Sequence, residues 1–157
     1  MKQLASPSTI LRQHALRAKH SWGQNFLGDE EILTRIVEAL SPAVGEPVLE
    51  LGAGLGHLTA ALLQAGAWLT AVERDRDLVR LLEEWHHPRL RVVAANAATL
   101  EFSKVAEVPH VAVVGNLPFH LTTPQMGGRP CVFEWSACPE EHALRTLRAC
   151  HPTLCPH

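Results

Sequence analysis

A glycine-rich turn and a carboxylate 19 residues beyond its second glycine are the first features of this sequence suited to hold a ligand. Gly52, Gly54 and Gly56 follow a short apolar run, and they lack the Cβ atoms that would keep a ligand away from the backbone. Glu73 ends the next apolar run, where a carboxylate can accept hydrogen bonds from both ribose hydroxyls of a nucleoside. Taken singly, the glycines also fit a tight turn, and Glu73 fits an exposed charge. Together they predict a site for a dinucleotide or for a nucleoside-containing methyl donor.

A second segment distinguishes between these two ligands. NLPF occupies residues 116–119, directly after the apolar run VAVVG. The Asn116 amide and a backbone carbonyl can accept hydrogen bonds from an exocyclic amine, and Phe119 offers a stacking face. Accepting both N–H bonds favours a pyramidal purine amine whose lone pair can attack a methyl group held in line, so positioning suffices and no metal is required. The alternative interpretation of NLPF is an ordinary Asn-Pro turn after a strand. In a hydride-transfer dehydrogenase, NLPF would have no evident use.

Strand-like and helix-like segments alternate around these residues. From Asp29, a plausible N-cap, the apolar residues of DEEILTRIVEAL share one helical face, and Ser41-Pro42 predicts the end of that helix. Four apolar runs predict strands, and two segments between them predict helices: PVLEL, WLTAVE, LRVVAA and HVAVVGN for the strands, and GHLTAALLQAG and RDRDLVRLLEEW for the helices. This alternation predicts an α/β fold with a parallel sheet and helices on both faces, and ligands bind at the carboxyl ends of such strands.

Composition limits the size and class of the protein. The 157 residues, 46% hydrophobic and 19% charged, fit one globular domain. No apolar run approaches the roughly 18 residues of a membrane span, and we expect a cytoplasmic location. The net charge is −2, but residues 1–28 contain no acid and include Arg12, Arg17 and Lys19. These residues predict a basic arm that can bind phosphates, with a solvated terminus or a transit peptide as alternatives.

The sequence changes character after Pro124. We expect no strand of comparable length beyond it, and only PEEHALRTLRAC, residues 139–150, predicts a helix. All four cysteines lie here, at positions 131, 138, 150 and 155, and their spacing does not match the close pairs of zinc sites. We therefore predict unpaired thiols rather than a metal site.

Five motifs in order carry a family resemblance: GQNFL (23–27), ELGAGLGHLT (50–59), VERDRDL (72–78), NAATLEF (96–102) and NLPFHLTTP (116–124). This set resembles the ribosomal RNA adenine dimethyltransferases, which methylate N6 of adjacent adenosines in small-subunit ribosomal RNA with S-adenosylmethionine as donor. The large-subunit adenine N6-methylases share most of these motifs, but the Leu-Pro pair and the closing Thr-Thr-Pro look more like the small-subunit enzymes. The resemblance implies a Rossmann-like class I methyltransferase fold and the small ribosomal subunit as partner.

The resemblance also implies a role for each matching residue. It places Asn25 and Leu27 in a flap over the cofactor, Gly52 and Gly54 at the amino-acid end of the cofactor, Glu73 at its ribose, Asn96 at its adenine, and Asn116 and Phe119 at the target base, with Asn116 also beside the cofactor. The base would be flipped out or unpaired.

Two departures from the family pattern stand out. Asn96 replaces the usual Asp, so its hydrogen bond to the cofactor adenine would lack charge assistance and binding would be weaker. The family's later strands and C-terminal domain have no counterpart after residue 124, as a truncation or a shifted reading frame would produce. We divide the chain into a basic arm and flap (1–28), the N-terminal half of a methyltransferase domain (29–124) and an atypical tail (125–157).

The missing half has consequences for folding and activity. The strand at 111–115 would be an unpaired, aggregation-prone edge unless the tail or a partner covers it. A non-catalytic RNA-binding or cofactor-binding remnant is therefore the main alternative to an active enzyme, and an NAD-binding oxidoreductase fragment is a further one.

Overall fold

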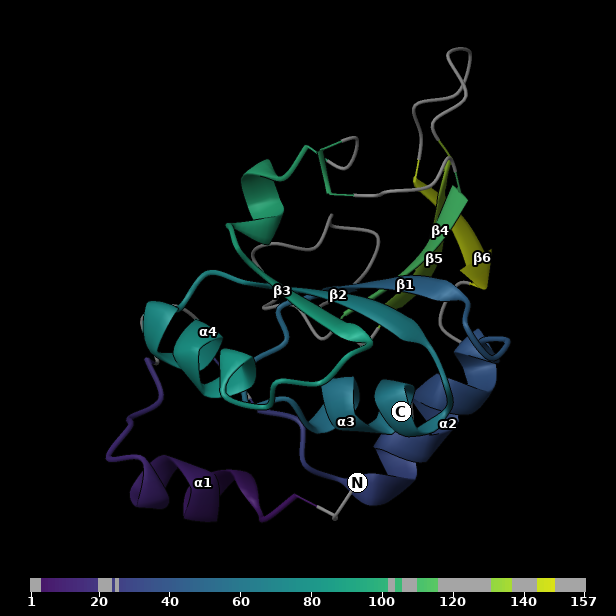
Figure 1. Ribbon diagram of the computed structural model, residues 1–157. Helices are drawn as coiled ribbons and strands as arrows, with labels where there is room; N and C mark the ends of the chain where they lie inside the picture. The colour runs from purple at the N-terminus through teal and green to yellow at the C-terminus, as the bar shows by residue number, and fades with distance from the viewer. Residues whose placement is uncertain are drawn as a thin grey trace.

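The computed structural model describes residues 4–19, 24, 26–101, 104–105 and 110–115, together with the backbone of two strands at 131–136 and 144–148. The strands form one six-stranded sheet in the order β3-β2-β1-β4-β5-β6 (Figure 1). Their bounds are β1 Pro47–Leu51, β2 Trp68–Glu73, β3 Leu90–Ala94, β4 His110–Gly115, β5 Cys131–Ser136 and β6 Leu144–Arg148. The first four strands pair in parallel, as the sequence predicts, whereas β5 and β6 pair antiparallel.

The direction of strand addition reverses between β1 and β4. The chain adds β2 and then β3 on one side of β1, and it returns to place β4 on the other side. Leu51 and Gly115 are register partners at the carboxyl ends of β1 and β4. In α/β sheets of this strand order, ligands bind outside the carboxyl ends of the strands at such a reversal. The turn after β1 therefore lies where a ligand is expected.

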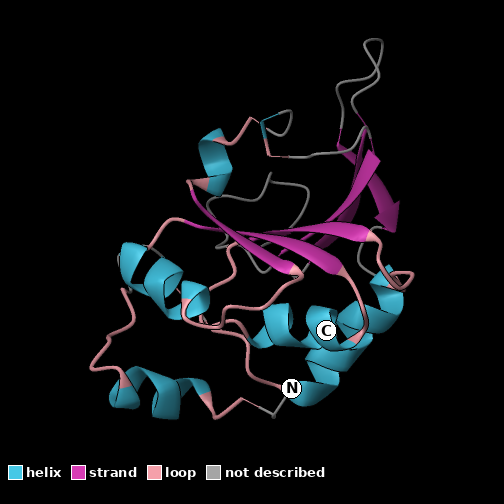
Figure 2. Cartoon of the chain, viewed as in Figure 1, coloured by secondary structure: helices cyan, strands magenta, loops and turns pink. Residues whose placement is uncertain are grey.

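The sequence predicts helices on both faces of the sheet, whereas the α-helices of the described residues lie on one side of it (Figures 1 and 2). They are α1 Pro7–Gln13, α2 Glu30–Leu40, α3 His57–Gln64 and α4 Arg76–Glu83. A short 3-10 helix, η2 (Ala97–Thr99), lies on the opposite side (Figure 1). None of the described helices is long and apolar enough to cross a membrane.

Helix α2 has the ends that the sequence predicts. The Asp29 side chain accepts hydrogen bonds from the backbone N–H groups of Glu31 at 2.9 Å and Ile32 at 3.2 Å, which satisfies two amides at the helix N-terminus. Ser41 ends the helix in the left-handed conformation, with φ of 46°. Pro42 follows and cannot continue the helix.

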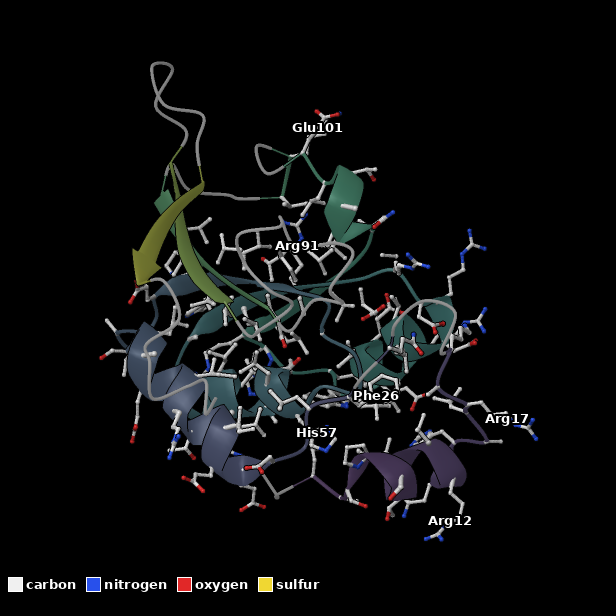
Figure 3. All side chains as sticks on the ribbon, turned by 180° about the vertical axis from the view of Figure 1, so that it is seen from behind. Arg12, Arg17, Phe26, His57, Arg91 and Glu101 are labelled. Atoms are coloured by element: carbon white, nitrogen blue, oxygen red, sulfur yellow. The ribbon has the colours of Figure 1, made fainter. Side chains whose placement is uncertain are left out.

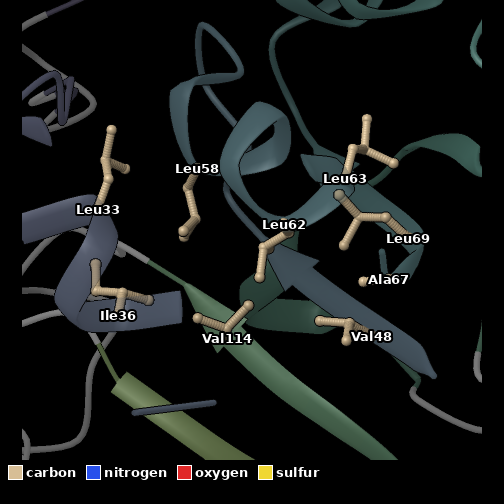
Figure 4. Close-up of a cluster of buried hydrophobic side chains, with 9 residues drawn as sticks. All are labelled: Leu33, Ile36, Val48, Leu58, Leu62, Leu63, Ala67, Leu69 and Val114. Carbon is tan, nitrogen blue, oxygen red and sulfur yellow. The ribbon is translucent and has the colours of Figure 1, made fainter. Parts of the chain in front are cut away.

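The main core lies between the sheet and helices α2 and α3 (Figure 4). Its buried members include one residue from each of β1, β2 and β4 and residues at helical spacing in α2 and α3, and they are Leu33, Ile36, Val48, Leu58, Leu62, Leu63, Ala67, Leu69 and Val114. A second cluster covers the other face of the sheet, where Val105 packs against strand residues such as Leu49 and Val113. Both faces of β1 and β4 are thus covered, which explains their nearly continuous apolar sequences.

The tail corrects two expectations. Strand β5 is six residues long and pairs with β4 along its whole length, from His110 opposite Ser136 to Gly115 opposite Cys131. The edge of β4 is therefore covered by the tail. The helix predicted within residues 139–150 is wrong at 144–148, where the chain forms β6. Periodicity over so short a segment cannot distinguish helix from strand, and pairing with β5 decides the outcome.

Candidate functional site

The turn between β1 and α3 contains three glycines in the left-handed region, Gly52 with φ of 73° and the two that follow it at alternate positions. Gly54 has φ of 59° and Gly56 has φ of 87°, in the region that side-chain-bearing residues rarely adopt. A Cβ atom on Gly54 would lie 3.3 Å from the Phe26 ring, and one on Gly56 would lie 2.5 Å from the Trp85 ring. At both positions the missing side chain thus makes room for an aromatic ring of the protein itself, Phe26 at Gly54 and Trp85 at Gly56.

Glu73 and Gly54, which the sequence separates by 19 residues, are in contact. The Gly54 backbone N–H donates to Glu73 Oε2 at 2.8 Å, and the N–H groups of Arg74 and Asp75 donate to Oε1 at 2.8 Å each. The carboxylate is 6% exposed. A carboxylate has about four lone-pair positions, so the three backbone donors leave one, on Oε2. Glu73 is therefore fixed at the glycine turn with a single acceptor position free of backbone bonds.

Asn96 lies at the same edge of the sheet, two residues beyond the end of β3. Ala94 is the register partner of Glu73, and the Ala95 N–H donates to the Glu73 carbonyl at 3.0 Å. The Asn96 side chain caps η2, because its Oδ1 accepts from the Ala98 N–H at 3.1 Å. The side chain is exposed. The amide oxygen keeps a second lone pair and the amide nitrogen keeps its donors for a ligand.

The flap residues differ in their surroundings. Leu27 packs against the main core cluster. Phe26, which the sequence did not single out, lies between α1 and the sheet (Figure 3) and borders Gly54. Three predicted site residues, Asn25, Asn116 and Phe119, lie outside the described residues.

Glu50 is a buried carboxyl group that the sequence prediction missed. It belongs to β1, is 1% exposed, and its Oε2 accepts a hydrogen bond from Thr59 Oγ1 of α3 at 2.7 Å. Burial raises the pKa of Glu50 to about 8, against the opposing effect of the Thr59 hydrogen bond and with a further contribution from the charge of Glu73. An acidic residue within an otherwise apolar strand is the sequence signal that points to such a group.

Comparison with known proteins assigns the chain to a family. The profile described as ribosomal RNA adenine dimethylase matches residues 15–127, which include the glycine turn, Glu73 and Asn96. The chain belongs to the ribosomal RNA adenine dimethylase family. With this membership and the strand order 3-2-1-4, the predicted Rossmann-like α/β class I methyltransferase fold is confirmed. The predicted division into arm, domain and tail stays a prediction.

Two curated relatives carry the name ribosomal RNA small subunit methyltransferase A. The protein of Myxococcus xanthus (strain DK1622) is 60% identical over 121 residues, covering 77% of this chain and 43% of the relative. The protein of Anaeromyxobacter sp. (strain K) is 52% identical over 129 residues, covering 76% of this chain and 45% of the relative. This family member thus spans less than half the length of the relatives it matches.

Solved structures with a similar arrangement include two RNA methyltransferases. The 23S rRNA methyltransferase ErmE has a TM-score of 0.47 at 28% identity, over 59% of this chain and 48% of that one. A dimethyladenosine transferase from Plasmodium falciparum has a TM-score of 0.48 at 18% identity, over 59% of this chain and 43% of that one.

Proposed function

We propose that this chain binds S-adenosylmethionine at its glycine turn and transfers methyl groups to N6 of adenosines in small-subunit ribosomal RNA, in the cytoplasm. The observation that carries the proposal is the 2.8 Å contact between the Gly54 amide and the Glu73 carboxylate at the carboxyl ends of the parallel strands. This contact joins the two features predicted to hold a nucleoside. Membership of the ribosomal RNA adenine dimethylase family and the names of the relatives support the reaction and the substrate.

The described residues fit such a cofactor in two respects. The remaining acceptor position on Glu73 Oε2 suits one ribose hydroxyl, rather than the two that the sequence suggested. At the adenine end, Asn96 can accept a hydrogen bond from the amino group through the second lone pair of Oδ1.

The part played by the protein is mainly one of binding and orientation. S-adenosylmethionine supplies, when bound, a methyl group on a positively charged sulfur. Glu73, the glycine turn and Asn96 would fix the cofactor relative to the sheet, and positioning of two reactants supplies much of the rate enhancement in such a transfer. Asn116 and Phe119, which follow β4, remain the residues predicted to hold the target adenine.

Calorimetry with S-adenosylmethionine and with NAD tests the cofactor assignment. We expect saturable binding of S-adenosylmethionine only, weakened about tenfold or more by Glu73→Gln because the amide loses charge and one acceptor oxygen. The matched control is Glu83→Gln on the exposed side of α4, which should bind as the parent does. Binding of NAD without binding of S-adenosylmethionine would contradict the proposal.

A methylation assay tests the activity. Small ribosomal subunits that lack the N6 methyl groups are incubated with radiolabelled S-adenosylmethionine, and large subunits serve as the competing substrate. We expect label in small-subunit adenosines. Cofactor binding without any transfer would identify a non-catalytic remnant, and label in the large subunit alone would identify the other branch of adenine methylases.

A further inference from the structure

The N-terminal arm is docked on the domain at several points along its described residues, 4–19, 24 and 26–28. Ile10 of α1 is 7% exposed and packs in a cluster with Leu55 of the glycine turn and Leu78 of α4. The ring N–H of His57 donates to the Ala5 carbonyl at 2.9 Å. The arm thus spans from the start of α3 to α4 and passes the glycine turn.

A buried carboxylate, Asp75, receives the far end of this arm. Lys19 Nζ lies 2.7 Å from Asp75 Oδ1, and Gln24 Nε2 donates to Asp75 Oδ2 at 2.9 Å. The backbone N–H of Lys19 donates in turn to Gln24 Oε1 at 2.8 Å, so the two arm residues also hold each other. Asp75 is 3% exposed. Burial alone would raise the pKa of Asp75, but the hydrogen bonds from Lys19 and Gln24 outweigh it and hold the pKa below its ordinary value.

The same Asp75 is joined to the candidate cofactor site. Its backbone N–H donates to Glu73 Oε1 at 2.8 Å, and Glu73 Oε2 accepts from the Gly54 N–H at 2.8 Å. Phe26, two residues after Gln24, lies against Gly54. The contacts therefore form a closed ring that runs from the arm through two carboxylates to the glycine turn and back to the arm.

We propose that Lys19, Gln24 and Asp75 form a clasp that positions Glu73 and the Phe26 segment for S-adenosylmethionine, so that arm docking and cofactor binding strengthen each other. The three are positioning residues that act through Glu73, and the inference rests on the proposed function. Glu73 has one acceptor position left. Its hydrogen bond to a ligand therefore requires the backbone at 73–75 to hold the carboxylate in the right place. Coupling between two binding events is reciprocal, so a cofactor that needs this geometry must also stabilise the docked arm.

Asp75→Asn and Lys19→Met break the clasp in two different ways. Asn caps helices as well as Asp does, so Asp75→Asn should leave α4 intact while its new NH2 group faces the NH2 group of Gln24. Each variant should bind S-adenosylmethionine about tenfold more weakly than the parent, within the roughly 5–150-fold range of coupled sites. The matched control, Arg35→Met, removes the exposed 2.6 Å ion pair with Glu31 on α2 and should bind as the parent does.

A double variant separates positioning from general damage. Gln24→Glu combined with Asp75→Asn restores both the negative charge and a donor–acceptor pair, with the roles exchanged. We expect it to recover most of the lost affinity. In the parent, S-adenosylmethionine should also slow tryptic cleavage after Arg17, which is exposed on the arm (Figure 3).

The outcomes for the clasp and for the proposed function are distinguishable. A parent that binds no S-adenosylmethionine overturns the proposed function. Unchanged affinity in both single variants, or no recovery in the double variant, overturns the clasp. Amide hydrogen exchange tests the clasp without cofactor, because Asp75→Asn should speed exchange at Gly54 and Arg74 several-fold relative to Arg35→Met, and equal exchange rates overturn the clasp whatever the cofactor results.

Discussion

Replacing Glu50 with Gln should remove a pH dependence from the free energy of unfolding between pH 5 and 8. Burial raises the pKa of the Glu50 carboxyl from 4.5 to about 8 in the folded chain. Between these values the folded chain holds a proton on Glu50 that the unfolded chain has lost, so the contribution of Glu50 to stability is most favourable below pH 4.5 and falls as the pH rises to about 8. Each pH unit corresponds to about 1.36 kcal/mol, so the whole interval amounts to at most about 5 kcal/mol.

The amide of Glu50→Gln is neutral at every pH and still offers an oxygen to Thr59. The variant should therefore match the parent at pH 5 and exceed it by several kcal/mol at pH 8.5. Urea unfolding followed by the fluorescence of the four tryptophans, repeated from pH 5 to 8.5, measures the difference at each pH. Titration of the histidines cancels in this difference because both proteins contain them all.

The control is Glu84→Gln, which changes an exposed carboxylate at the end of α4. Its free energy of unfolding should vary with pH in parallel with that of the parent. Parallel profiles for the parent and Glu50→Gln would refute the reasoning, because they would mean that Glu50 is ionised in the folded chain at neutral pH.

Three further substitutions test other parts of the structure. Gly56→Ala should cost about 2–4 kcal/mol of stability in urea unfolding, because its Cβ would overlap the Trp85 ring at a backbone φ of 87°; a change below 0.5 kcal/mol would contradict that packing. Asn96→Asp should keep the hydrogen bond from Ala98 and tighten S-adenosylmethionine binding about threefold to tenfold in calorimetry through charge assistance; weaker binding would argue against contact with the adenine. Ala15→Gly should raise the melting temperature and add about 0.5–1 kcal/mol, because Ala15 follows α1 with a φ of 53°, and a lower melting temperature would be the opposing result.

Much of the parallel sheet could be predicted because each strand is a short apolar run that ends at a turn. The contact between Gly54 and Glu73 was also predictable in outline, since adjacent parallel strands end at one edge of the sheet. The role of Gly56 was not, because a missing Cβ in a sequence does not tell whether a ligand or Trp85 fills the space. Glu50 was missed because its burial depends on packing between β1 and α3.

The polar clasp and the tail strands depend on distant parts of the chain. Nothing local in the sequence pairs Lys19 with Asp75, which lies 56 residues away. The segment at 144–148 has helical spacing but forms β6, because the open edge of β5 offers backbone partners that a short amphipathic segment can take instead.

The three backbone bonds to Glu73 also bear on the entropy of ligand binding. A free glutamate side chain loses about 1.5–2 kcal/mol of rotamer entropy when it is ordered. The N–H groups of Gly54, Arg74 and Asp75 already hold this carboxylate in the folded chain. The side chain therefore loses its rotamer entropy on folding, and ligand binding adds no further loss. At about 1.4 kcal/mol per tenfold change in affinity, this preorganisation is worth roughly a factor of 10–30 in dissociation constant, gained without any additional contact to the ligand.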